Sequence, residues 1–323
     1  MIHGCEIQIR VSPDCCIKIQ YANHINGTAR ISKIGMSKSK KIGGDDSTGV
    51  DTSPADIDDE HDIALRPGPN ADWAEDVQRH VSQDIYARYD VFSYRHAASV
   101  LATSFPKELK QIEQALHQFS LTTREIQEPG KNESEIPKKF SRALRPEGWI
   151  ETRVQGDLLI RLSEYDEIER ANGRLQKKKR ADPAPVVVEN FIDGHKIDYV
   201  KGRIALDLEW NSKDQTFDRD LYALRAFHEC GLISVGVLVT RSVKLNPLFN
   251  VLPVLDQSGE VKIGKNGKPA MCNSKYGAST TWMGKLLYRL NAGRHGGCPV
   301  LVFGIRPDVV TDWKNHELNP ERR

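Results

Sequence analysis

Three acidic residues near the middle of the chain have types and a spacing that could do chemistry. Asp198 is followed by eight residues and then by Asp207-Leu208-Glu209. Apolar and polar residues alternate in RIALDLEW (203–210), which predicts a strand with one buried face. Asp207 and Glu209 share the other face, about 6–7 Å apart at a rise of about 3.3 Å per residue. Asp198 precedes this strand, in a predicted loop, and can fold back beside Asp207 across a hairpin.

Three carboxylates that meet at one strand end suit a hard divalent cation such as Mg²⁺, which prefers oxygen ligands. A cation held in this way supports the hydrolysis of phosphate esters. The same alternation is also typical of an amphipathic strand whose acidic face is exposed to solvent. The following residues, 211–221, favour the metal site, because they form a polar segment with both charges and lead into an amphipathic helix instead of a short Gly or Pro turn.

Residues 197–241, with the Asp-x8-Asp-x-Glu spacing at their centre, resemble type II restriction endonucleases of the BglII/BstYI group. These enzymes are relatives of BamHI and belong to the PD-(D/E)XK nuclease superfamily. The resemblance implies that Asp198, Asp207 and the backbone carbonyl of Leu208 hold Mg²⁺. It also implies that Glu209 orients or deprotonates the attacking water. Two residues depart from the group: Asp207 replaces its usual Glu, and Glu209 replaces its Gln, as in BamHI, where most of the superfamily has Lys.

The resemblance implies a Mg²⁺-dependent homodimeric endonuclease that cuts double-stranded DNA at a short palindrome, with a GATC core and 5′ overhangs as in the named enzymes. A restriction enzyme of this type works with a cognate DNA methyltransferase. Two alternatives on the same fold remain open. One is a repair or recombination nuclease that recognises DNA structure, and the other is a DNA-binding protein that has lost catalysis.

Further site residues follow from the same resemblance. An additional active-site residue is expected just after Gly148-Trp149, at Glu151 or Thr152, although Glu151 is also typical of an ordinary surface acid. Polar residues after the acidic strand and before a later helix are candidates for DNA contact, although Ser and Thr before a helix often act only as caps. These candidates are Asn211, Ser212, Lys213, Lys275, Ser279 and Thr280.

The distribution of charge divides the chain. Residues 45–76 contain eleven acids and one base, with several Pro, Gly and Ser, which is typical of a disordered segment. Without that stretch the net charge rises from +2 to +12, as expected for a protein that binds a phosphate backbone. We therefore expect a disordered acidic extension over 1–85, an endonuclease domain over 86–314 and a C-terminal tail over 315–323.

The remaining pattern predicts an α/β protein with a mixed central sheet flanked by helices, a restriction-endonuclease-like fold. Helices are expected at 106–120, 132–145, from Asp218 as the cap to 229, and from 282 to about 291. Buried strands are expected at 233–240 and 299–305. The basic run 174–180 (RLQKKKR) precedes two prolines and is expected to form an exposed loop that touches phosphate.

The composition also bears on location. No apolar run reaches the length of about 18 residues that a membrane-spanning helix needs. Six cysteines are scattered without a C-x-x-C pair, which fits free thiols in a reducing cytosol. The sequence therefore predicts a cytoplasmic protein with no membrane segment.

Overall fold

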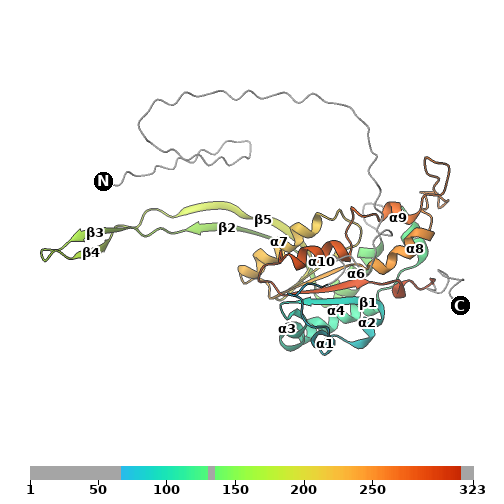
Figure 1. Cartoon of the computed structure of the whole chain (residues 1–323), viewed down its shortest axis with the longest axis horizontal. Helices are drawn as coiled ribbons and strands as arrows, with labels where there is room; N and C mark the ends of the chain where they lie inside the picture. The colour runs from blue at the N-terminus through green and yellow to red at the C-terminus, as the bar shows by residue number, and fades with distance from the viewer. Residues whose placement is uncertain (1–66, 130–134, 314–323) are drawn as a thin grey trace, which may run out of the picture. The chain divides into compact units, whose positions relative to one another are not determined.

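The centre of the fold is a six-stranded mixed sheet in the order β1-β8-β7-β6-β5-β2. The protein is represented by a computed structural model, which describes residues 67–129 and 135–313 (Figure 1). β6, β7 and β8 run parallel to one another, and the other strands pair antiparallel with their neighbours. The strands of this sheet are β1 (Tyr89–Tyr94), β2 (Ile150–Ile160), β5 (Val186–Lys201), β6 (Ile204–Glu209), β7 (Val235–Arg241) and β8 (Val300–Ile305).

Helices cover both faces of the sheet, which confirms the predicted α/β class. One face buries apolar residues against most of the helices, and the other is covered by α7 and α10. None of the described helices is long and apolar enough to cross a membrane. The helices are α1 (Ala74–Gln78), α2 (Gln83–Arg88), α3 (Ala97–Ser104), α4 (Pro106–Gln118), α5 (Thr123–Gln127), α6 (Glu135–Leu144), α7 (Thr216–Glu229), α8 (Asn246–Val251), α9 (Cys272–Lys275) and α10 (Met283–Asn291).

The predicted long helices α4, α6, α7 and α10 are present, as are the strands β7 and β8. β6, α7 and β7 form the predicted strand–helix–strand unit with parallel strands. One boundary differs, because α7 begins at Thr216 and Asp218 lies in its first turn instead of capping it. Asp218 instead forms an ion pair with Arg289 of α10 at 2.9 Å, so its carboxylate joins the two helices.

Regular structure begins earlier than the predicted domain boundary at residue 86. α1 and α2 lie before or across that boundary, and their Val77 and Ile85 are buried in the core. These helices have only five and six residues, too few for a helical periodicity to stand out in the sequence. The rest of the predicted extension, 1–66, and the predicted tail, 315–323, lie outside the described residues.

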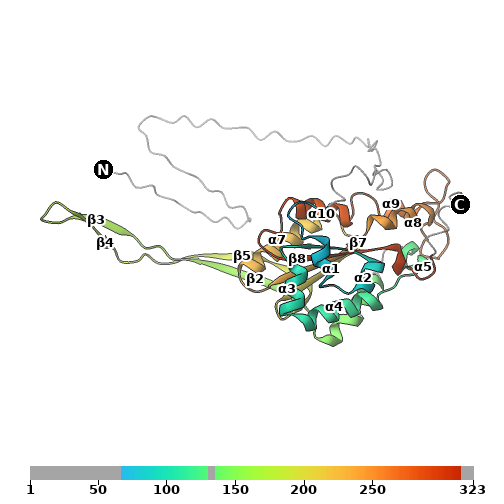
Figure 2. The same cartoon turned by 60° about the horizontal axis from the view of Figure 1, so that its bottom comes forward.

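β2 and β5 extend beyond the sheet as a long ribbon that ends in the hairpin of β3 (Tyr165–Glu169) and β4 (Leu175–Lys179) (Figure 1 and Figure 2). The basic run 174–180 was expected to form a loop, but most of it is β4. Two of its three lysines lie opposite acids of β3, with Lys178 opposite Asp166 and Lys177 opposite Glu167. Opposite charges in such cross-strand pairs favour the strand, and the sequence pattern of one strand alone does not reveal them.

The ribbon exposes apolar side chains that no described element covers. Two strands cannot shield their own faces, so these residues remain in contact with solvent. They are Leu159, Ile160, Leu162, Tyr165, Ile168, Leu175, Val186, Val187 and Phe191.

Candidate active site

β6 holds two of the acidic residues in the interior. Asp207 and Glu209 are only 5% and 9% exposed. Leu206 and Leu208 pack on the face covered by most of the helices, whereas Ala205 packs on the face covered by α7. By alternation, Asp207 and Glu209 point to the α7 side. This burial excludes the alternative of a solvent-exposed acidic face.

Asp198 is brought beside Asp207 by the antiparallel pairing of β5 with β6, in which the preceding pair is Tyr199 and Leu206. At the same place, the pairing of β5 with β2 is irregular. Ile150 of β2 pairs with Val200 of β5, and the next pair is Thr152 with Ile197. Between these two pairs, β5 therefore contains one residue more than β2. The extra residue is a β-bulge, a feature that redirects a side chain. The Asp198 amide donates a hydrogen bond to Asp207 Oδ1 at 2.7 Å. The predicted hairpin is therefore present, with Asp198 on a strand instead of in a loop.

Two residues that the sequence analysis missed join this group, His195 of β5 and Asp220 of α7. The side chains of His195 and Asp220 are 8% and 3% exposed, and His195 Nε2 lies 3.5 Å from Asp220 Oδ1. His195, Asp207 and Asp220 each place one potential ligand atom within 4.8 Å of the others. Asp220 could have been found, because it lies three residues after Phe217, on the apolar stripe of α7.

The electrostatics of the cluster follow from burial and like charge. Burial, with the charges of Asp198 and Glu209, raises the pKa of Asp207 well above its usual value. Burial also raises the pKa of Glu209 to about 7, against a hydrogen bond from Ser212 that lowers it. Burial, followed by the charges of Asp207 and Glu209, raises the pKa of Asp220 to about 9. A bound divalent cation would stabilise the ionised carboxylates, so the donor set fits an oxygen-preferring metal.

The two segments predicted to contact DNA lie side by side, although they are far apart in the sequence. Lys213 forms an antiparallel bridge with Thr280, and the Thr281 amide donates to the Ser212 carbonyl at 2.8 Å. Asn211, Lys213 and Ser279 are exposed, so their side chains are accessible at the end of β6. The pairing places these candidates on one surface next to Glu209, and their contact with DNA stays a prediction.

Arg241, which the sequence analysis did not single out, ties these segments together. It lies at the end of β7 and is 1% exposed. Its guanidinium donates to the carbonyls of Trp210 and Thr281 at 2.7 and 2.8 Å and to the Thr280 hydroxyl. It also lies 5.0 Å from the centre of the Tyr276 ring. Burial lowers its pKa to about 10, which leaves it charged at neutral pH.

The other predicted residues are placed differently. The Lys275 ammonium donates to the carbonyls that end α5, including that of Ile126 at 3.0 Å. Glu151 forms an exposed ion pair with Lys196 at 2.6 Å. Thr152 is half-buried, and its hydroxyl donates to the carbonyl two residues earlier at 3.2 Å. The structure therefore does not bring Glu151 into the carboxylate cluster, and Lys275 supports the end of a helix.

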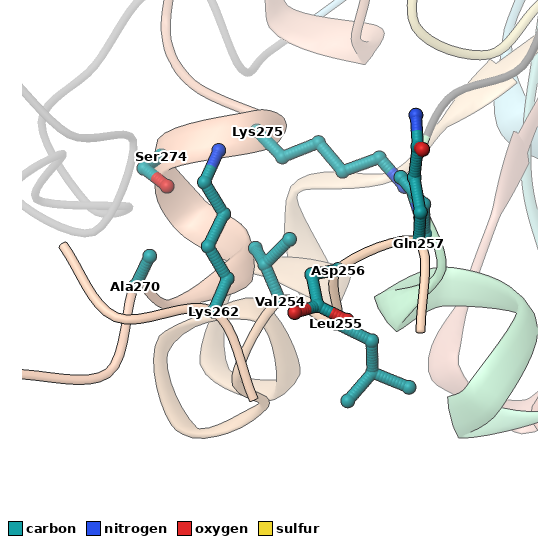
Figure 3. A pocket seen from close by; sticks show the side chains of 9 residues that line it. Val254, Leu255, Asp256, Gln257, Lys262, Ala270, Ser274 and Lys275 are labelled. Atoms are coloured by element: carbon teal, nitrogen blue, oxygen red, sulfur yellow. The ribbon is translucent and has the colours of Figure 1, made fainter. Parts of the chain in front are cut away.

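A pocket of about 490 Å³ lies elsewhere, beside α9 (Figure 3). The carboxylate cluster contributes no residue to its wall, so this cavity is separate from the candidate active site. The pocket is lined by Pro129, Val254, Leu255, Asp256, Gln257, Lys262, Ala270, Ser274 and Lys275.

Comparison with known protein families gives one match. The model of the family described as Restriction endonuclease BglII/BglIII matches residues 89–305, about two thirds of the chain. The match runs from the first residue of β1 to the last residue of β8, so it contains the whole six-stranded sheet and the carboxylate cluster. No curated protein matches the chain.

The raised pKa values predict how the stability of the metal-free protein depends on pH. The folded protein holds protons on Glu209 and Asp220 that the unfolded chain releases near pH 4, so stability falls as the pH rises through about 7 and 9. In chelator, we expect the melting temperature to fall from pH 6 to pH 9. Asp220→Asn should raise the melting temperature at pH 8 by roughly 2–4 °C, equivalent to about 1 kcal/mol.

The matched control is Glu229→Gln, on the exposed side of the same helix, where it forms an ion pair with Arg225. It should leave the pH dependence unchanged. Circular dichroism melts at several pH values measure both variants. Equal pH profiles for Asp220→Asn and the parent protein would contradict the assignment of the buried acid.

Arg241→Lys should destabilise the protein by about 2–3 kcal/mol, because an ammonium cannot reproduce the forked donor and leaves buried carbonyls without partners. Urea denaturation measures the change. Arg225→Lys, on the exposed face of α7, is the control and should stay within about 0.5 kcal/mol. Equal midpoints for the two variants would show that Arg241 does not hold the segments together.

Proposed function

The chain belongs to the BglII/BglIII family of restriction endonucleases, and we propose that it is a Mg²⁺-dependent type II enzyme that cuts double-stranded DNA at a short palindrome. Family membership makes it a nuclease that acts on DNA. The observation that carries the finer proposal is the placement of Asp198 beside Asp207, with Glu209 on the same face of β6. This arrangement matches the metal-ligand spacing expected from the sequence.

The cation would be held by Asp198, Asp207 and the backbone carbonyl of Leu208. When bound, it supplies positive charge that offsets the negative charge developing on the phosphate and the leaving oxygen. Glu209 Oε2 has no hydrogen-bond partner among the described residues. With a pKa raised to about 7, Glu209 can accept a proton from the attacking water at neutral pH. The hydrogen bond with Ser212 orients its carboxylate.

The assembly follows from the substrate. One active site cuts one strand, so cleavage of both strands of a palindrome suits a two-fold homodimer. A restriction enzyme also requires a cognate DNA methyltransferase that protects the host DNA, which places the pair in the cytoplasm. A GATC core and 5′ overhangs come from the likeness of residues 197–241 to the BglII/BstYI group.

Digestion of unmethylated phage DNA with purified protein and Mg²⁺ tests the proposal. Discrete fragments whose sequenced ends share one palindrome are the expected result. A smear would indicate a nuclease that does not read a fixed sequence, such as one that recognises DNA structure. No cutting with either Mg²⁺ or Mn²⁺ would reject the catalytic proposal in favour of DNA binding alone.

Asp198→Ala should reduce cleavage by at least about a hundredfold, because loss of a metal ligand removes several kcal/mol of charge stabilisation. Site-specific DNA binding, measured in chelator by gel shift, should persist. Asp193→Asn is the control, because Asp193 is exposed on the same strand. Cleavage that survives Asp198→Ala would overturn the metal assignment.

A further inference from the structure

We infer that His195, Asp207 and Asp220 form a second cation site, which shares Asp207 with the proposed Mg²⁺ site and prefers a transition metal such as Mn²⁺. This inference rests on the proposed function only in that the two metal sites share Asp207. The three side chains come from β5, β6 and α7 respectively, so the site lies between the sheet and the helix that covers it.

The distances suit a cation. The ligand atoms lie within 4.8 Å of one another, and His195 Nε2 is 3.5 Å from Asp220 Oδ1. Metal–ligand bonds of about 2.0–2.2 Å place ligand atoms on opposite sides of one ion about 4.4 Å apart. A contraction of a few tenths of an ångström therefore closes the site.

Two buried atoms at this position receive no hydrogen bond from the part of the chain that the structure describes. Among residues 67–129 and 135–313, neither His195 Nε2 nor Asp220 Oδ2 has a hydrogen-bond partner, although both side chains are more than nine-tenths buried. An unsatisfied buried polar atom destabilises the fold, and a cation would satisfy both atoms at once. Their shared lack of partners is the observation, independent of acidic charge, that indicates a ligand.

The positive charge of Arg219 lies near the site but does not block the entry of a cation. Arg219 Nε lies 3.9 Å from Asp220 Oδ1, but its side chain is 67% exposed. It can therefore turn toward solvent when a cation enters. The remaining neighbours, Asp198 and Glu209, are carboxylates and add to the attraction for a cation.

The ligand types determine selectivity. Mg²⁺ prefers an all-oxygen shell, whereas imidazole suits transition metals such as Zn²⁺ and Fe²⁺. Mn²⁺ lies between the two groups, because it takes the carboxylate oxygens that Mg²⁺ takes and, as a transition metal, also accepts one imidazole nitrogen. The Asp198–Asp207–Leu208 site offers oxygen alone, and the His195–Asp207–Asp220 site adds one imidazole nitrogen. The full-length protein should therefore bind more Mn²⁺ than Mg²⁺ per chain.

Isothermal titration calorimetry of the full chain without DNA tests this inference, with Mn²⁺ and Mg²⁺ as separate probes. We expect two Mn²⁺ and one Mg²⁺ per chain. His195→Gln should weaken the second Mn²⁺ at least tenfold and leave Mg²⁺ binding unchanged. Even residues outside the first coordination shell typically contribute 10–100-fold to metal affinity. Unchanged Mn²⁺ binding in His195→Gln would overturn the inference.

Two further variants separate this inference from the proposed function. Asp198→Asn should remove Mg²⁺ and leave one Mn²⁺ that still depends on His195. Glu229→Gln, on the exposed face of α7, should bind both metals as the parent does. If Asp198→Asn keeps its Mg²⁺ while His195→Gln loses one Mn²⁺, the proposed catalytic site fails and the second site stands.

A spectroscopic measurement on the parent protein avoids any effect of substitution on folding. Pulsed electron paramagnetic resonance of bound Mn²⁺ detects coupling to a nitrogen nucleus when imidazole is a ligand. We expect this coupling in the parent protein and its loss in His195→Gln. Absence of nitrogen coupling in the parent protein, at two Mn²⁺ per chain, would overturn the inference.

Discussion

Asp198, Asp207, Glu209 and Asp220 bring as many as four negative charges into a region that α7 shields from water. Burial favours the neutral acids, and mutual repulsion among the carboxylates favours them further, so without a cation the cluster retains protons near neutral pH. A divalent cation reverses this balance. The described residues supply the carboxylates of this cluster but no cation within it to balance their charge. Acids buried together in this way are typical of a functional site, and a metal site is one such case.

Arg241 provides the opposite charge without neutralising the acids. Its guanidinium binds carbonyls and rings instead of a carboxylate, and so fixes the end of β6 against the segment before α10. The strand that carries Asp207 and Glu209 and the surface proposed to contact DNA consequently share one buried support. A change in the position of either segment must be accommodated by the same hydrogen bonds, because the donor fork is rigid.

Much of this architecture could be read from local sequence. The alternation in β6 and the apolar stripes of α4, α6, α7 and α10 depend on neighbours a few residues away, and the predicted elements are present. The missed features depend on remote partners. The bulge at Asp198 is defined by β2, and the ligand role of His195 requires Asp220, which is 25 residues later in the sequence. The strand β4 is stabilised by the acids of β3, so its basic run alone resembles a loop.

The exposed ribbon of β2 and β5 has no core against which its two strands are aligned, so a shift in their pairing register must be prevented in another way. Strands without a buried face are weakly specified in register, and a slip of one residue would move every side chain of one strand to the other face. The irregular ladder prevents this, because its second shift places Gly194 at a φ of 83°, where a Cβ would come within 2.7 Å of Arg153 Nε. A slipped ladder would force a residue with a side chain into that position. The irregular positions thus fix the register of β2 against β5, the strand that also carries His195 and Asp198.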